Sequence, residues 1–212
     1  MAFTDATIDV QGLRPGFAEV LSGLEADLGV PFARLNQVHG DRVHLVDGPM
    51  PLNGVPEGDA LLTTVPSMGL MIRVADCVPV LLGDAEAGVI AAAHAGRQGM
   101  VLDIVTRTVE SMHEHGARSI TAWIGPHVCA ACYEVPEQMR AEIAAAIPAA
   151  YAETSWGTPA LDLGAGVRSQ LERAGVEVRD VSRCTREDPA LHSYRRDGAA
   201  SGRLAGLIWM NP

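Results

Sequence analysis

Lysine is absent from this sequence of 212 residues, in which all sixteen basic residues are arginine. The absence excludes Schiff-base catalysis and the common phosphate-binding P-loop, because both use a lysine ammonium group. Positive charge is also scarce, with 16 basic against 26 acidic residues and a formal net charge of −10. A general binder of nucleic acid or of anionic membranes needs a basic surface, so the composition argues against both kinds of partner.

Long apolar runs and cysteines are few as well. No stretch approaches the roughly 18 to 20 apolar residues that a membrane-spanning helix needs. Residues 1–9 show no basic region followed by an apolar run, so a secretory signal is not predicted. Four cysteines are too few for a disulfide scaffold in a chain of this length. The expectation is a cytoplasmic protein whose thiols are free or bind a metal.

The patterning of apolar residues predicts one domain, residues 1–212, because no repeat or long linker divides the chain. Helical spacing occurs in four segments, namely Phe17–Leu28, Gly99–His113, Glu137–Ile147 and Gly166–Arg173. Strands are expected at Val43–Val46, Asp59–Thr64, Gly69–Val74, Val78–Leu82, Gly88–Ala93, Ile120–Ile124, Val176–Val181 and Leu204–Trp209. Three of these strands are almost wholly apolar, which is typical of strands buried on both faces. The mixed order predicts an α+β or mixed-sheet α/β fold with helices packed on mostly buried sheets.

Three short polar segments lie at or beside the ends of predicted strands, and they contain His39, Cys77 and His94. Two imidazoles and a thiol are donors that zinc accepts, and three protein ligands leave the fourth tetrahedral position open, as in catalytic zinc sites. Zinc in such a site lowers the pKa of bound water to about 7. Taken singly, each of these histidines is more often a structural residue and Cys77 is more often a buried small hydrophobic residue, so the spacing alone is a weak signal for a metal site.

Two other motifs suggest metals at first sight. Cys129 and Cys132 form a C-x-x-C pair, but no second pair follows and Cys184 stands alone, so a zinc ribbon is not supported. The thioredoxin and zinc-deaminase patterns are also incomplete around this pair, which leaves a structural or pocket-lining role. His113 and His115 lie near the end of a predicted helix, where residues two apart face different sides, and a solvated helix end explains them.

The segment Ser193–Gly198 contains Arg195 and Arg196, and Arg203 follows closely. In an acidic protein, such a cluster of guanidinium groups predicts an anion or phosphate site, since arginine binds phosphate with two hydrogen bonds. The alternative is that these arginines lie on the surface and pair with Asp197. The sequence favours neither interpretation over the other.

Taken together, seven blocks resemble the multicopper polyphenol oxidase (laccase-like) domain family, also described as purine nucleoside phosphorylase-type proteins. The blocks occur in the family's order and cover most of the chain from residue 36 onward. They are Asn36–Gly40, Asp59–Thr63, Ala75–Val80, Ala93–Gly96, Gly125–Val135 (with Gly125-Pro126 and Cys132-Tyr-Glu-Val135 as its matching parts), Leu161–Leu163 and Ser193–Asp197.

The resemblance implies a three-layer domain and a metal, usually zinc, bound by His39, Cys77 and His94, with a purine-nucleoside pocket beside it. These three residues are accordingly predicted to be catalytic. Contacts to the substrate are expected from Asn36, Gln37, Asp76, Arg97, Cys132, Arg195 and Arg196. The family's activities are phosphorolysis of adenosine, inosine, guanosine and methylthioadenosine, adenosine deamination and polyphenol oxidation, and bacterial relatives are linked to editing of peptidoglycan precursors.

Two departures from the family pattern touch the expected rim of the pocket. Only Ala2–Asp5 matches the usual N-terminal segment, and Arg97-Gln98 stands where the family commonly has Trp-Arg. The leading hypothesis is a metal-dependent purine nucleoside phosphorylase with small-molecule substrates, in which zinc is the expected metal and copper the alternative, and adenosine deaminase activity is a second expectation. The alternatives are a copper-dependent phenol oxidase, whose weak axial ligand would be a methionine such as Met68, Met71 or Met100, or a non-enzymatic or precursor-editing relative. The oligomeric state is left open.

Overall fold

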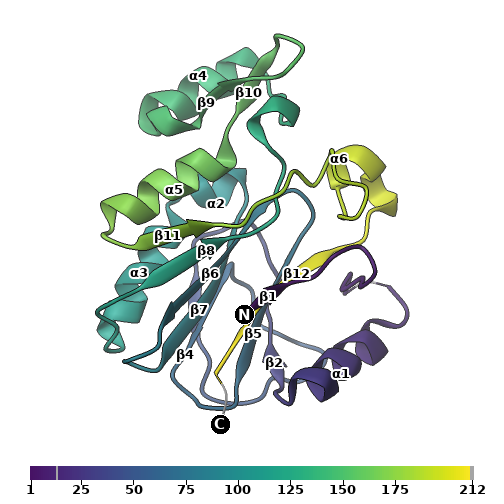
Figure 1. The fold of residues 1–212 in the computed structure, drawn as a ribbon, viewed down its shortest axis with the longest axis vertical. Helices are drawn as coiled ribbons and strands as arrows, with labels where there is room; N and C mark the ends of the chain where they lie inside the picture. The colour runs from purple at the N-terminus through teal and green to yellow at the C-terminus, as the bar shows by residue number, and fades with distance from the viewer. Residues whose placement is uncertain (13, 211–212) are drawn as a thin grey trace.

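The computed structural model describes residues 1–12 and 14–210, and most of its strands lie in two mixed sheets (Figure 1). The larger sheet has the order β11-β8-β6-β7-β4-β3, and the smaller has the order β1-β12-β5-β2. The strands of the larger sheet are β3 (Val43–Leu45), β4 (Ala60–Thr63), β6 (Val78–Asp84), β7 (Val89–Ala95), β8 (Thr121–Ile124) and β11 (Glu177–Asp180). Those of the smaller sheet are β1 (Ala2–Phe3), β2 (Phe32–Ala33), β5 (Gly69–Val74) and β12 (Leu204–Trp209). A separate hairpin joins β9 (Tyr151–Glu153) to β10 (Pro159–Leu161).

The two sheets and one group of helices form three layers. Helices α2 (Arg97–Val101), α3 (Ile104–Glu114) and α5 (Leu163–Arg173) cover one face of the larger sheet, and the smaller sheet packs on its other face. The single helix α1 (Phe17–Leu28) covers the outer face of the smaller sheet. The remaining helical elements are η1 (Ala130–Cys132), α4 (Glu137–Ala146), η2 (Pro148–Ala150), α6 (Tyr194–Asp197) and η3 (Gly198–Ala200).

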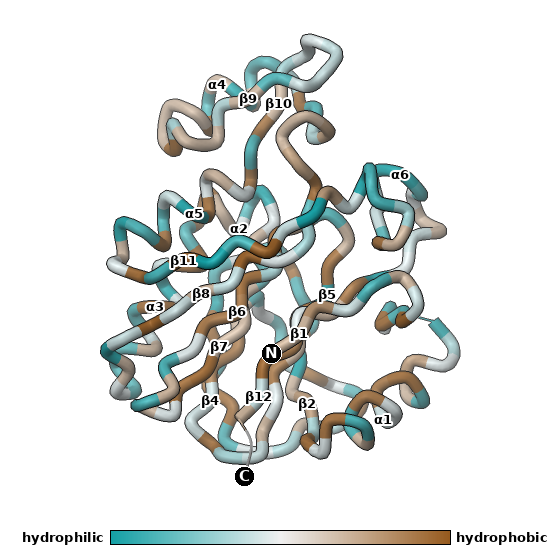
Figure 2. Tube along the Cα trace, viewed as in Figure 1, coloured by the Kyte–Doolittle hydropathy of each residue, from teal (hydrophilic) through white to brown (hydrophobic). Residues whose placement is uncertain are grey.

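The apolar strands of the larger sheet are buried on both faces, as their sequences predicted. In β7, Ala91 and Ala93 belong to the core beneath the helices, whereas Ile90 and Ala92 belong to the core between the sheets. The alternation follows from the two-residue period of a strand. Figure 2 shows brown, hydrophobic stretches along β4, β6, β7 and β12. The expected fold class, a mixed α/β domain with helices on buried mixed sheets, is therefore confirmed.

The long helix expected over Gly99–His113 is two helices. The chain adopts a left-handed conformation at Asp103 (φ 59°, ψ 46°), and this separates α2 from α3. Aspartate tolerates this region better than most residues, so the break falls where it costs little. The helix expected from Gly166 instead begins at Leu163, because the Asp162 carboxylate accepts a hydrogen bond from Ala165 N and caps the helix.

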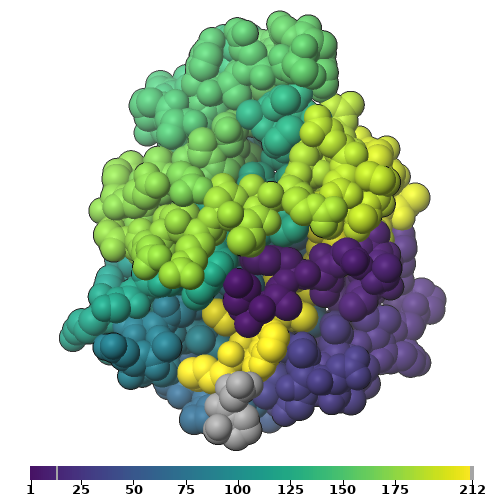
Figure 3. Space-filling model, viewed as in Figure 1, coloured from purple at the N-terminus to yellow at the C-terminus, as the bar shows by residue number. Residues whose placement is uncertain are grey.

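The two ends of the described chain lie together on the smaller sheet. The amide of Thr4 donates to the Ala205 carbonyl and that of Ala6 to the Ala190 carbonyl, and Figure 3 shows the purple N-terminal residues against the yellow C-terminal segment. Among the described residues, no helix combines the length and apolar character needed to cross a membrane.

Candidate functional site

The three predicted metal ligands come from different parts of the fold and meet where the two sheets join. His39 lies in the loop between β2 and β3, and His94 lies near the end of β7. Cys77 lies between β5 and β6, where the chain leaves the smaller sheet and enters the larger one. This crossover carries the thiol to the end of β7, because β6 pairs with β7 and Val78 is opposite Ala95.

The ligand atoms of His39, Cys77 and His94 all lie within 4.8 Å of one another. Cys77 Sγ is 3.7 Å from His39 Nε2, and the two imidazole rings meet edge to face with centroids 4.8 Å apart. His94 is buried, whereas His39 is exposed and Cys77 is half-buried. The three donors therefore converge on one point that stays accessible from the side of His39.

Asp59 holds two of these ligands in place, although the sequence analysis gave it no role. Its Oδ1 accepts hydrogen bonds from His94 Nδ1 (2.8 Å) and from the His39 amide (2.9 Å), and its Oδ2 accepts one from the Gly40 amide (2.6 Å). With Nδ1 engaged in this way, His94 presents Nε2 to the metal position. A carboxylate behind a ligating histidine is a common arrangement in zinc sites. The only sequence signal was that Asp59 begins one of the family-like blocks.

Charge is strongly coupled within the site. Burial raises the pKa of the Cys77 thiol, but the charge of His94 and hydrogen bonds from both histidines outweigh it and lower that pKa to about 6. Burial lowers the pKa of His94, but the Cys77 thiolate and Asp59 outweigh it and raise that pKa to about 9. Without a metal, the site therefore holds a thiolate beside an imidazolium near neutral pH. A divalent cation would replace the imidazolium proton.

The backbone around the site is shaped to bring the ligands together. His39 and Asp76 have positive φ angles of 62° and 90°, a conformation that is uncommon for residues other than glycine and that concentrates at functional sites. A Cβ atom at Gly96 would lie 2.7 Å from His39 Cδ2 and 3.0 Å from Cys77 Sγ. Only glycine therefore fits at position 96 with both ligands in place.

Asp76 connects the site to the C-terminal loop. Its Oδ1 accepts hydrogen bonds from Thr185 Oγ1 (2.6 Å) and Ser193 Oγ (2.7 Å), and its Oδ2 accepts one from the Arg195 amide (2.6 Å). These three partners of its carboxylate all lie more than one hundred residues away in sequence. Asp76 thus anchors α6 and the loop before it beside the metal ligands, and it is a structural link as well as a residue of the cleft wall.

A cleft of about 1160 Å³ opens beside the three ligands and is lined by all of them. The predicted contact residues Asn36, Gln37, Asp76 and Arg195 also line it. Five arginines reach this cleft, namely Arg14, Arg34, Arg73, Arg195 and Arg203. Its aromatic residues are Phe17, Tyr133 and Tyr194.

Comparison with known proteins agrees with this geometry. A family model described as multi-copper polyphenol oxidoreductase laccase matches residues 9–211. The chain belongs to this family. A protein of Streptomyces coelicolor named purine nucleoside phosphorylase is 55% identical over 190 residues, which cover 87% of this chain and 78% of that protein. A Mycobacterium bovis protein of the same name is 48% identical over 193 residues, which cover 88% and 76% of the two chains.

Solved structures with the same fold include a Neisseria meningitidis protein from the family DUF152. It aligns with a TM-score of 0.83 at 28% sequence identity, covering 97% of this chain and 87% of that one. The Bacillus licheniformis protein YfiH aligns with the same TM-score of 0.83 at 26% identity, covering 92% and 81% of the two chains. The laccase-like family is associated with metals, and the His39–Cys77–His94 group supplies this member with a candidate metal site.

Three of the residues predicted to contact the substrate do not line the cleft in this laccase-like chain, namely Arg97, Cys132 and Arg196. Arg97 begins α2 and is not among the residues that line the cleft. The Arg196 guanidinium donates to the backbone carbonyls of Thr185, Asp188 and Leu191 and to the Asp197 carboxylate, so it holds the loop together.

Cys132 lies in a second cluster, which sequence reasoning did not assemble. Its thiol is 3.4 Å from Glu187 Oε1, and it meets Cys129 and Cys184 in a group whose ligand atoms lie within 4.8 Å of one another. Burial, and then the Glu187 carboxylate, raises the pKa of Cys132. The C-x-x-C pair therefore has partners after all, and Cys184 does not stand alone.

The other histidine and methionine candidates are structural. His113 Nδ1 bonds to the Ala117 carbonyl and His115 Nδ1 to the Ser111 carbonyl at the end of α3, which is consistent with a capped helix end. The methionines considered as axial copper ligands are buried in three different core clusters, and none lines the cleft: Met68, Met71 and Met100.

Proposed function

We propose that this protein is a zinc-dependent purine nucleoside phosphorylase that converts adenosine, inosine, guanosine or methylthioadenosine and phosphate to the free base and the ribose 1-phosphate. The observation that carries the proposal is a single cleft that combines a three-donor metal site with three arginines, Arg34, Arg73 and Arg203, for which the described part of the chain shows no ion pair. Relatives that are up to 55% identical carry the name purine nucleoside phosphorylase.

The residues present fit a zinc ion. His39, Cys77 and His94 supply three donors, and the Asp59 carboxylate fixes the tautomer of His94 so that Nε2 faces the other two ligands. Three donors leave one tetrahedral position open toward the cleft. When bound, zinc would polarise an oxygen atom of phosphate or water.

Phosphate needs a concentration of positive charge, and Arg34, Arg73 and Arg203 provide it. Burial lowers the pKa of Arg73, and the charges of Arg34 and Arg203 lower it further. Among residues 1–12 and 14–210, none of these three guanidinium groups forms an ion pair with a carboxylate. Three adjacent like charges that form no ion pair in the described residues are typical of an anion site, because a bound anion relieves their repulsion.

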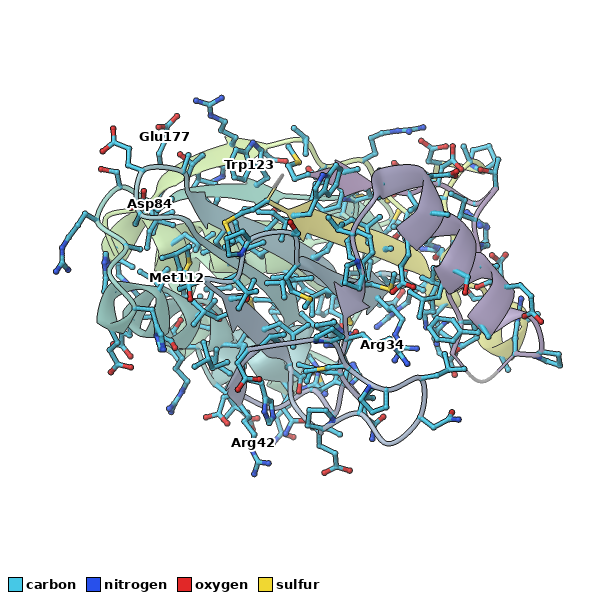
Figure 4. All side chains as sticks on the ribbon, turned by 90° about the horizontal axis from the view of Figure 1, so that it is seen from below. Arg34, Arg42, Asp84, Met112, Trp123 and Glu177 are labelled. Atoms are coloured by element: carbon cyan, nitrogen blue, oxygen red, sulfur yellow. The ribbon has the colours of Figure 1, made fainter. Side chains whose placement is uncertain are left out.

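Arg73 is the residue that we expect to contact phosphate most directly. Its Nη2 donates to the Leu35 carbonyl (3.0 Å), whereas its buried Nε atom has no hydrogen-bond partner among the described residues. Buried donors are rarely left unpaired in proteins. Arg34 lies beside α1, with its guanidinium 5.5 Å from the centre of the Phe17 ring (Figure 4). Together they would hold the phosphate dianion for attack of one oxygen on C1′ of the ribose.

The departing purine would occupy the part of the cleft next to Tyr133 and Tyr194. Arg195 stacks over Tyr133, with 4.2 Å between its guanidinium carbon and the ring centre. The C1′–N bond breaks with its electron pair on the base, so hydrogen-bond donors near the base stabilise the developing charge. The amide of Asn36 and the guanidinium of Arg195 are the cleft groups proposed for this role.

Adenosine deamination is a second proposed activity, and the observation that favours it is the open position at the metal site. A metal held by His39, Cys77 and His94 would supply a polarised water for hydrolytic removal of the 6-amino group as ammonia. Copper-dependent phenol oxidation remains as the alternative, since a His₂Cys donor set also suits copper. The burial of the three candidate axial methionines away from the cleft counts against it.

The test is an assay of zinc-loaded protein with each nucleoside, with and without phosphate. We expect hypoxanthine from inosine only when phosphate is present, and replacing arginine by methionine (Arg73→Met) should raise the KM for phosphate at least tenfold. Arg42 is a matched control, because it is exposed and its side chain does not line the cleft (Figure 4). Arg42→Met should leave that KM unchanged.

Failure to release hypoxanthine from inosine or ammonia from adenosine would contradict the enzymatic proposal. A protein that binds zinc and keeps its stability in that case would be a non-enzymatic or precursor-editing relative. Copper content together with an intense visible thiolate-to-copper absorption band would instead support phenol oxidation.

A further inference from the structure

The chain contains a second group of metal-type ligands, formed by Cys129, Cys132, Cys184 and Glu187. We infer that these four residues bind a structural zinc ion, separate from the metal at the cleft. The juxtaposition that carries the inference is three free thiols and one carboxylate whose ligand atoms lie within 4.8 Å of one another. We call this group the thiol cluster.

Topology explains how residues 55 positions apart come together. Strands β8 and β11 are parallel neighbours, so the segments that leave them run side by side. The pairing continues past the strands as a parallel bridge between His127 and Cys184. The Cys129 amide lies 3.4 Å from Cys184 Sγ, which places the C-x-x-C turn directly over the second segment.

The spacing of the ligands is that of a zinc site. Cys129 and Cys132 are separated by two residues, and so are Cys184 and Glu187. The chain therefore contributes two short turns with two donors each, as in structural sites built from paired C-x-x-C turns. Here a carboxylate takes the place of the fourth thiolate, and zinc accepts carboxylate oxygen as a ligand.

The distances agree with this interpretation. A tetrahedral zinc ion with Zn–S bonds of about 2.3 Å holds its sulfur atoms about 3.8 Å apart and a sulfur and an oxygen about 3.6 Å apart. Cys132 Sγ and Glu187 Oε1 are already 3.4 Å apart, and the widest separation in the cluster is within 4.8 Å. Binding requires a contraction of roughly 1 Å at most, which side-chain rotation can supply.

Four protein donors also distinguish this cluster from the site at the cleft. Structural zinc sites are closed by four protein ligands, whereas catalytic sites keep a position open. The softness of three thiolates favours zinc over magnesium or calcium, which prefer oxygen. The zinc ion would join the turn after β8 to the segment after β11, and so fix the loop that carries Thr185 to the Asp76 carboxylate.

The experiment is a measurement of zinc per chain by elemental analysis, on protein purified with reductant and loaded with zinc. We expect about two zinc ions in the unaltered protein and about one in each of two variants, Cys77→Ser and Cys132→Ser. With cobalt in place of zinc, the thiolate-to-cobalt absorption should keep its larger part, from the three thiolates of the cluster, in Cys77→Ser. In Cys132→Ser only the smaller part, from the single thiolate of Cys77, should remain. The Cys77→Ser arm is the matched control, since it alters only the site at the cleft.

Glu187 provides a test that does not depend on replacing a buried cysteine, because its side chain is exposed. Removal of the charge in Glu187→Gln should speed the release of one zinc ion to a chelator at least tenfold. The substitution Glu187→Cys completes a four-thiolate set and should slow that release. Equal release rates in the unaltered protein and both variants would overturn the assignment of the carboxylate as a ligand.

Two further results would overturn the inference as a whole. One is a single zinc ion per chain that disappears completely in Cys77→Ser. The other is a disulfide between two of the cluster cysteines that forms in the presence of zinc, which would assign the cluster to redox chemistry. Neither result depends on whether the protein cleaves nucleosides, so failure of the proposed phosphorylase activity would leave this test intact.

Discussion

Replacing Asp59 by asparagine should weaken zinc binding at the cleft, although position 59 does not itself contact the metal. The change conserves shape but exchanges one acceptor oxygen for an NH₂ group. In the structure, Oδ1 accepts from His94 Nδ1 and the His39 amide, while Oδ2 accepts from the amides of Gly40 (2.6 Å) and Val38 (3.3 Å). Each oxygen therefore faces two N–H groups, and an amide can satisfy only one of the two sets.

Both orientations of the asparagine are unfavourable. With its NH₂ group toward Gly40, two backbone donors lose their acceptor and the loop that carries His39 loosens. With its NH₂ group toward His94, Nδ1 must accept, so the proton moves to Nε2 and blocks the nitrogen that should bind zinc. Loss of such a carboxylate behind a ligand typically costs about 10- to 100-fold in metal affinity, or about 1.4–2.7 kcal/mol.

Asp84 provides a matched control for this variant. It is also buried, and its two oxygens accept from four backbone amides, those of Glu86, Ala87, Arg118 and Ser119. Those hydrogen bonds lower the pKa of Asp84 to about 2. Figure 4 shows Asp84 on the opposite side of the molecule from Arg34, which lines the cleft.

The assay compares zinc affinity, by competition with a chelator, and thermal stability in the two variants. Both should lose stability, by about 3 kcal/mol if two hydrogen bonds to a charged group are lost. Only Asp59→Asn should lose zinc affinity at the cleft. The reasoning is refuted if Asp59→Asn binds zinc within threefold of the unaltered protein, or if Asp84→Asn weakens zinc binding equally.

Three further predictions concern the same site. Gly96→Ala should lower the affinity for zinc at least tenfold, because the added Cβ atom would overlap two of the ligands. Gly83→Ala is the control and should not lower it, because the atom nearest to its added Cβ is 3.7 Å away. Titration of both variants with zinc measures the difference. Because the pKa of His94 is raised to about 9, zinc binding displaces a proton below that pH. The logarithm of the zinc association constant should therefore rise by about one per pH unit from pH 6 to 9 and then level off, and a flat profile would contradict the ion pair. Thr185→Val should lower the free energy of unfolding by about 1.5–3 kcal/mol, measured by urea denaturation, because it removes one of the three hydrogen bonds to the buried Asp76 carboxylate.

The central strands of the larger sheet could be predicted because they are buried on both faces and are therefore apolar at almost every position. Val78–Asp84 and Val89–Ala95 alternate between the helix-covered core and the core between the sheets, so almost every position is apolar. The hairpin of β9 and β10 was missed because each strand has only three residues, too few to display a period. The interpretation of residues 1–212 as one domain stays a prediction.

The start of α5 was predicted three residues too late because of two glycines in its first turns. Gly164 and Gly166 weaken the helical pattern, but a Cβ atom at Gly166 would lie 2.3 Å from Met100 Sδ. The glycine therefore permits close packing of α5 against α2. Packing of this kind arises from the tertiary structure, so no propensity argument applied to the segment alone could reveal it.

The three metal ligands could be predicted from the sequence, but the carboxylate that holds two of them in place could not. His39, Cys77 and His94 stood out as metal-binding residue types beside strand ends, and the structure brings them within 4.8 Å of one another. Asp59 was overlooked because a single aspartate at the start of a strand has many explanations. Its role appears only when β4 pairs with β7, which places Ala60 opposite Ala93 and so sets Asp59 beside His94.

The thiol cluster could not be assembled from spacing because its two halves depend on the parallel pairing of β8 and β11. That pairing also connects the cluster to the cleft. Thr185 directly follows the cluster residue Cys184, and Asp76 directly precedes the cleft ligand Cys77, and a hydrogen bond of 2.6 Å joins the two. The four donors of the thiol cluster suit a structural zinc ion, whereas the three donors at the cleft leave a position open for the reaction. The loop that carries Arg195 should therefore depend on the thiol cluster for its position.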